Sequence, residues 1–243
     1  FSISTESNID ASEWSRKFMA GFVYFTESER QSNRGEHAAV RLIENKIDVL
    51  KATQANDMST ALYNDGSVSS DVIGLQALVA DTPTNQVGGI NAATFTWWQN
   101  KAYTGTTATA SNIKGLLNTA WLDTIRGADR PDLLIAGNNM FTLYWESLTD
   151  QQRYTSADAK GDTLKHQNLA FQDATLMFDP TCNTNRLYGL DTSDMEFCCD
   201  PGRRFAQLGA RDVTNALYEV VPVVWSGALL MKRRESHFVI NGA

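Results

Sequence analysis

The chain has 243 residues, of which 42% are hydrophobic and 20% are charged, and its formal net charge is −7. Such a composition is typical of a globular protein, and a compact chain of this length would bury about 70–75% of its unfolded surface without a disulfide or a metal. The sequence has no apolar run of the roughly 20 residues that a membrane helix needs, and its acidity argues against a nucleic-acid-binding surface spread over the whole chain.

Residues that carry site chemistry are few. The sequence contains three histidines, each standing alone, with no second ligand four residues from His37, and it has no CxxC, HExxH, GxSxG or Walker-type motif. Cys182, Cys198 and Cys199 form an odd set without metal-ligand spacing, so we expect reduced thiols. The chain starts at Phe1 without an initiator Met, so we expect processing or an N-terminal part beyond this sequence. We predict a structural protein with no catalytic residue, cofactor or metal, and not an enzyme.

The N-terminal third predicts a strand, a loop and a long helix. Residues 14–26 are rich in aromatic and β-branched side chains, which favours an extended strand. Residues 27–34 are almost wholly polar and are expected to form a loop. In residues 36–63 the apolar positions recur with a period close to 3.6, which predicts a helix roughly 42 Å long.

The remainder of the chain alternates short apolar segments with turns. Residues 68–79 indicate a loop or a short strand, and residues 82–89 are rich in turn formers. Helices are predicted at 112–126, where Ser111 is a capping residue, and at 138–148. Strands are predicted at 133–136, 174–178, 186–190, 217–230 and 238–240.

Two residue pairs are candidates for site chemistry. Glu27 and Glu29 are neighbouring carboxylates, but nothing nearby is apolar enough to shift their pKa values, which favours a solvated loop. Trp97 and Trp98 could form an aromatic platform for a sugar or a base, although packing in a core or an interface is the simpler interpretation. A carbohydrate-binding or hydrolytic domain that uses these residues is therefore kept as an alternative.

Four motifs, in a fixed order along the chain, carry a resemblance to a known family. They are Trp14 to Tyr24 followed by Ser32-Asn33-Arg34-Gly35-Glu36; Val87-Gly88-Gly89-Ile90-Asn91 followed by Trp97-Trp98; Pro131-Asp132-Leu133-Leu134-Ile135-Ala136 followed by Tyr144 and Gln152-Arg153-Tyr154; and Leu169-Ala170-Phe171-Gln172-Asp173-Ala174 followed by Phe178-Asp179-Pro180 and Arg186-Leu187-Tyr188. This order resembles that of tailed-bacteriophage major capsid proteins with the HK97 fold.

The resemblance implies an α+β, HK97-like capsid fold. Such a fold has a peripheral (P) domain, built from a long spine helix and a β-sheet, together with an axial (A) domain and an extended loop (E-loop). On this chain it implies an N-terminal segment and E-loop strand at 1–34, and a P-domain at 35–129 with the spine helix at 36–63 and a second helix at 112–126. It implies an A-domain at 130–194, and a return through A-domain and P-domain strands at 195–243.

The resemblance also implies a function. It predicts a major capsid protein whose copies assemble into the pentamers and hexamers of an icosahedral head shell, which encloses double-stranded DNA without sequence-specific binding. Scaffold, portal and decoration proteins are its expected further partners, with assembly in the host cytoplasm and no membrane. An encapsulin-like nanocompartment shell is the alternative within this fold. The predicted assembly-interface residues are Phe18, Phe22, Tyr24, Glu27, Glu29, Arg30 and Arg34.

Overall fold

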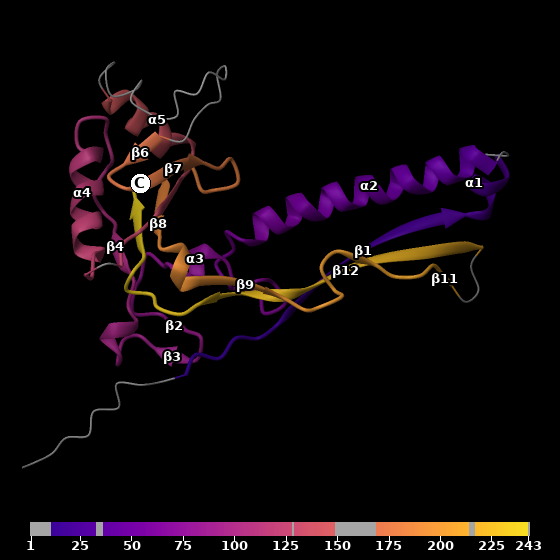
Figure 1. Cartoon of the computed structure of the whole chain (residues 1–243), viewed down its shortest axis with the longest axis horizontal. Helices are drawn as coiled ribbons and strands as arrows, with labels where there is room; N and C mark the ends of the chain where they lie inside the picture. Colours follow the sequence, from indigo (N-terminus) through magenta and orange to yellow (C-terminus); the bar gives the residue numbers. More distant parts are fainter. Residues whose placement is uncertain (1–10, 33–35, 128, 149–168, 214–216, 243) are drawn as a thin grey trace, which may run out of the picture.

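The computed structural model describes residues 11–32, 36–127, 129–148, 169–213 and 217–242. Figure 1 shows a long arm on the right and a more compact part on the left. The arm has two layers, with helix α2 (Glu36–Ala61) lying along strands β1 (Lys17–Thr26) and β12 (Tyr218–Met231). Among the described residues, no helix is both long and apolar enough to span a membrane.

The sheet of the arm is built around β12. Strand β1 pairs antiparallel with β12 over its whole length, from Lys17 opposite Gly227 to Thr26 opposite Tyr218. The other edge of β12 pairs with three short strands. These are β9 (Met195–Cys199), β10 (Ala206–Gln207) and β11 (Arg211–Asp212). Within the described chain, β1 pairs with β12 alone and is therefore an edge strand.

Helix α2 covers one face of this sheet. Ile47 of α2 packs in a buried cluster with Val23 and Phe25 of β1. At Gly21 the two layers touch, because a Cβ atom there would lie 2.6 Å from Leu50 Cδ1. The buried side chain of Gln54 donates a hydrogen bond of 2.9 Å to the backbone oxygen of Val223 and so ties the helix to β12.

The compact part is a six-stranded mixed sheet with the strand order β4-β13-β8-β5-β7-β6. These strands span Lys101–Tyr103, Phe238–Asn241, Arg186–Leu190, Leu133–Ala136, Ala174–Phe178 and Leu169–Phe171, in that order. Helices α4 (Ile113–Thr124) and α5 (Asn138–Ser147) contribute to the buried cluster on one face. The other face packs on α3 (Leu75–Leu78) and on Leu229 and Met231 at the end of β12.

Strand β12 thus belongs to both parts, and buried polar side chains fix the turn that follows it. Arg234 is fully buried and donates to the backbone oxygens of Leu78 (2.8 Å) and Trp98 (3.2 Å) and to Asn100 Oδ1 (2.8 Å). Burial lowers the pKa of Arg234 to about 10. The segment that it holds includes β2 (Gln86–Val87), β3 (Ile90–Asn91) and the 3-10 turn η1 (Thr96–Trp98).

Most predicted elements are present, and two expectations are wrong. Residues 27–32 form a short helix, α1 (Glu27–Ser32), where a loop was expected. Part of 68–79 is the helical turn α3, because Leu75 and Leu78 are both buried on one side of it. The short strands β2, β3, β4, β6, β9, β10 and β11 were not predicted. The second predicted helix, α4, packs beside α5 on the six-stranded sheet. The division into domains stays a prediction.

Candidate assembly interface

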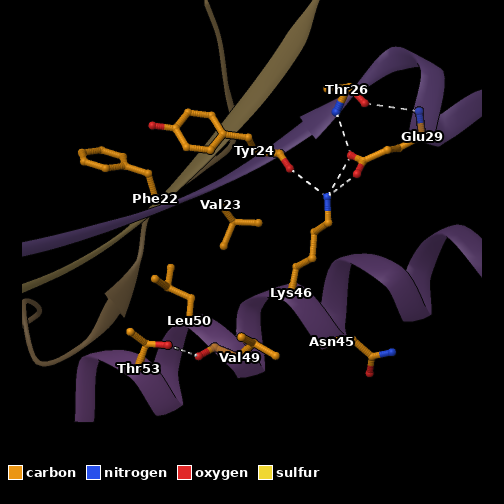
Figure 2. A pocket seen from close by; sticks show the side chains of 10 residues that line it. All are labelled: Phe22, Val23, Tyr24, Thr26, Glu29, Asn45, Lys46, Val49, Leu50 and Thr53. Carbon is orange, nitrogen blue, oxygen red and sulfur yellow. Dashed lines mark hydrogen bonds and ion pairs between the residues drawn. The ribbon is translucent and has the colours of Figure 1, made fainter. Parts of the chain in front are cut away.

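The outer end of the arm is held by a polar clamp at the start of α1. Thr26 and Glu29 form a capping box: Thr26 Oγ1 accepts from the backbone N–H of Glu29 (3.3 Å), and Glu29 Oε2 accepts from the N–H of Thr26 (3.1 Å). Lys46 of α2 then donates to both oxygens of Glu29 (2.7 and 2.8 Å) and to the backbone oxygen of Tyr24 (3.1 Å), as Figure 2 shows. The hydrogen bond to Lys46 is the main reason that the pKa of Glu29 lies below its usual value.

Strand β1 is apolar on both faces, and α2 covers one of them. Val23 and Phe25 point towards α2 and are 6% and 5% exposed. Phe22 and Tyr24 point away from α2 (Figure 2) and are 51% and 53% exposed. Phe18 lies on the same face by strand alternation and is 66% exposed. Three large aromatic side chains in a row therefore remain in water in the single chain. Contiguous exposed apolar surface of this kind marks a contact site.

The aromatic residues continue into a wider sheet face, which we call the outward face. Residues directly opposite each other in an antiparallel pair lie on the same side of a sheet. Tyr24 lies opposite Val220, and Val220 lies opposite Arg211 of β11. The outward face consists of Phe18, Ala20, Phe22, Tyr24, Tyr218, Val220, Pro222, Val224, Ala206 and Arg211. Aromatic and arginine side chains on an apolar background are typical of the centre of a protein–protein interface.

The free edge of β1 borders an open groove. The amide of Leu208 donates to the backbone oxygen of Pro222, and the amide of Ser226 donates to the backbone oxygen of Arg203. The backbone groups of the even-numbered residues of β12 are therefore directed away from β1. By the same alternation, the backbone of Ala20 and Phe22 points to the free edge. A groove of ≈ 610 Å³ lies there, between β1 and α2 (Figure 2). An edge strand next to an apolar groove is a template for further strand pairing.

The predicted interface residues separate into three groups. Phe18, Phe22 and Tyr24 share the outward face, as alternation in a strand requires. Glu27 is exposed on α1, whereas Glu29 already has Lys46 of its own chain as a partner. The side chain of Arg30 and the whole of Arg34 lie outside the described residues. Contact of these residues with a neighbouring copy stays a prediction.

The residues proposed for sugar chemistry do not form one site. Trp98 is 2% exposed and donates from Nε1 to the backbone oxygen of Val87 (2.9 Å), and Trp97 packs against it. Glu27 and Glu29 lie in α1, at the far end of the arm from β2 and β3 (Figure 1). Among the described residues, no group of His, Cys, Asp and Glu has the geometry of a metal site.

Some residues of this region were missed in the sequence. The pattern Thr26-x-x-Glu29 is a capping-box signature and would have predicted α1. Lys46 could not be linked to Glu29, because the two meet only when α2 folds back over β1. Arg211 reaches the outward face through its register with Val220, which no local pattern encodes.

No protein-family model and no curated protein matches this sequence. Several solved structures are similar to it over nearly the whole chain. The capsid of cyanophage A-1(L) is 16% identical, with a TM-score of 0.59 over 93% of this chain and 77% of that chain. The SrpI encapsulin of Synechococcus elongatus PCC 7942 is 9% identical, with a TM-score of 0.62 over 95% of this chain and 75% of that chain.

The capsid of an empty GTA particle is 12% identical, with a TM-score of 0.59 over 100% of this chain and 81% of that chain. At these identities the likeness establishes the fold. The predicted fold class is confirmed: the chain has the α+β, HK97-like fold that phage capsids share with an encapsulin.

Proposed function

We propose that this chain is a major capsid protein, a structural subunit whose copies assemble into the icosahedral head shell of a tailed phage around double-stranded DNA. The observation that carries the proposal is the capsid fold over nearly the whole chain, joined to an outward face that a single copy leaves exposed. A shell repeats one contact many times, so its subunit needs a large apolar surface outside its own core. The role that we propose is structural and requires no catalysis.

The parts of the structure suggest how the chain would be divided in a shell. We assign the arm, with α2 as the spine helix, to the P-domain, and β1 to the strand that returns from the E-loop. We assign the six-stranded sheet to the A-domain. Helix α4 packs on that sheet beside α5, so we move residues 113–124 from the P-domain of the sequence-based division into the A-domain.

An encapsulin-like shell is the second candidate, and the similarity to the SrpI encapsulin favours it specifically. Both candidates predict closed cages, and they differ in content and attachments. Packaged DNA or tails on the native particle indicate a virus, whereas small cages without DNA that hold a protein cargo indicate an encapsulin. Scaffold, portal and decoration proteins are proposed as partners for the first candidate only.

The proposal is tested by imaging the purified protein. We expect the full chain, concentrated at physiological salt, to give hollow particles with five-fold vertices in negative-stain electron microscopy. Images of native particles then separate the virus from the encapsulin. A chain that stays monomeric at high concentration, with an intact circular-dichroism spectrum, contradicts both candidates.

A further inference from the structure

We infer that the two edges of the arm sheet bind each other between neighbouring copies, head to tail. The arginines of the 203–211 segment of one copy dock in an acidic cleft beside Phe18 of the next copy. This inference rests on the proposed function, and it names the contact that orders copies around a ring.

The receiving surface is a cleft of ≈ 400 Å³ between the start of β1 and the C-terminal half of α2. Phe18, Met19 and Val72 line it with apolar surface, and Asp57 and Asp71 add two carboxylates. Within the described chain, neither carboxylate forms an ion pair. Asp71 accepts only from neutral neighbours: the side-chain amide of Asn64 and the hydroxyl of Ser70. The cleft is therefore apolar and carries two carboxylates, with the ammonium group of Lys17 close by on the backbone oxygen of Ser69, which leaves room for a further cation.

The matching surface lies on the opposite edge of the same sheet. Arg203, Arg204 and Arg211 are exposed on the segment that carries β10 and β11. In the part of the chain that the structure describes, none of these three forms an ion pair. Asp200 pairs with Arg16 at 2.7 Å and interacts with Arg203 only through space, without an ion pair. We call these three residues the arginine margin.

The chemistry of the two surfaces is complementary. A guanidinium group can donate two parallel hydrogen bonds to a carboxylate, while its apolar stem packs on an aromatic ring. The carboxylates of Asp57 and Asp71 lie in the cleft, and Phe18, which is 66% exposed, borders it from the outward face of β1. The arginine margin also adjoins the outward face, because Arg211 lies in register with Val220 and Tyr24. One contact can therefore use both charge and apolar area.

The topology shows why the partner is a second copy. β12 separates β1 from β10 and β11, so the cleft and the arginine margin lie on opposite edges of the sheet, and no ion pair joins them among the described residues. A contact between two different patches repeats in one direction and closes into a ring when the rotation allows it. DNA fits less well, because three arginines are a small footprint on a chain of net charge −7 and carboxylates repel phosphate.

The test uses charge reversal in the full chain. We expect Arg203→Glu/Arg204→Glu and Asp57→Lys/Asp71→Lys each to weaken self-association at least about tenfold, which is about 1.4 kcal/mol. The quadruple variant, with the charges exchanged, should return within about threefold of wild type. Glu44→Lys/Asp48→Lys is the matched control for Asp57→Lys/Asp71→Lys. It makes the same change in net charge on exposed residues of α2 that do not line the cleft.

Sedimentation velocity measures association, and circular dichroism with thermal melting verifies the fold of each variant. An equimolar mixture of the two reversal variants adds a sharper test. The two can associate only by alternating, so they should close six-membered rings but not five-membered ones. Electron microscopy should therefore show sheets or tubes of hexamers instead of closed shells.

Three outcomes overturn the inference: reversal variants that associate like wild type, a folded quadruple variant that does not recover, or a mixture that forms closed shells. The proposed function fails separately. The wild type could form head-to-tail oligomers that charge reversal abolishes, but no shell. That result would support the inferred contact and contradict the capsid proposal. A wild type that stays monomeric contradicts both.

Discussion

Because the two faces of β1 differ in burial, the same Phe→Ser change at two positions can test assembly and folding separately. Phe22 and Phe25 stand three residues apart on the same strand, one on the outward face and one under α2. We expect Phe22→Ser to impair assembly and leave the subunit folded. Phe25→Ser should instead destabilise the folded subunit, because it removes the same ring from the core of the arm.

The magnitudes follow from the exposed fractions. A phenylalanine side chain presents roughly 200 Å², and Phe22 is 51% exposed, so about 100 Å² would leave water in a contact. At about 25 cal/mol per Å² this is about 2.5 kcal/mol per contact, or roughly 60-fold in the association constant. Phe25 is 5% exposed. Its truncation should lower the free energy of unfolding by about 3–5 kcal/mol.

Two assays separate the effects. Light scattering follows shell growth from dissociated subunits, and urea unfolding of the same subunits gives the free energy of unfolding. By the same area arithmetic, the half of Phe22 that its own chain already covers limits the cost of Phe22→Ser to about 2.5 kcal/mol of unfolding free energy, below that of Phe25→Ser. If Phe22→Ser unfolds as easily as Phe25→Ser, or assembles like wild type, the outward face is not an interface and the reasoning fails.

Three further predictions concern the contacts that shape the chain. Lys46→Met should speed amide hydrogen exchange in α1 about tenfold, measured by mass spectrometry, because the clamp on Glu29 is lost; unchanged exchange would contradict this role. Arg234→Met should lower the free energy of unfolding by about 3 kcal/mol or more in urea, since buried oxygens lose their donor, whereas Arg233→Met, at partly exposed ion pairs with Asp129 and Asp194, should cost about 1–2 kcal/mol. Burial lowers the pKa of His237 to about 4 from 6.5, so the unfolded chain binds the extra proton first, and stability present above pH 6.5 is lost as the pH falls towards 4. His237→Gln should flatten this fall in the melting temperature, and an unchanged slope would assign it to other groups.

The sequence was most informative where a short apolar run stands between turn formers. The strands at 133–136, 174–178 and 186–190 have their predicted bounds, because proline, glycine and aspartate limit each run. The long helix was equally clear from its period. In contrast, α1 was missed because polar composition was interpreted as a loop, although its cap at Thr26 is a local signal.

The candidate interface could be predicted only in part. The alternation of Phe18, Phe22 and Tyr24 is visible in the sequence, but so is the apolar character of Val23 and Phe25 on the other face. Which face α2 covers depends on close packing, above all at Gly21, and no periodicity encodes that choice. The arginine margin depends on strand register between distant segments, which explains why the sequence did not link it to β1.

The arm has the surface of a sheet with one layer missing. A sheet that is apolar on both faces needs cover on both to be stable in water. In this chain α2 covers one face, and among the described residues no second layer lies over Phe18, Phe22 and Tyr24. A fold selected only to be a stable monomer would place polar residues at these positions, as solvent-facing strands usually do. The aromatic residues are therefore best explained by a third layer that a neighbouring copy supplies, so that assembly completes the packing that folding leaves open.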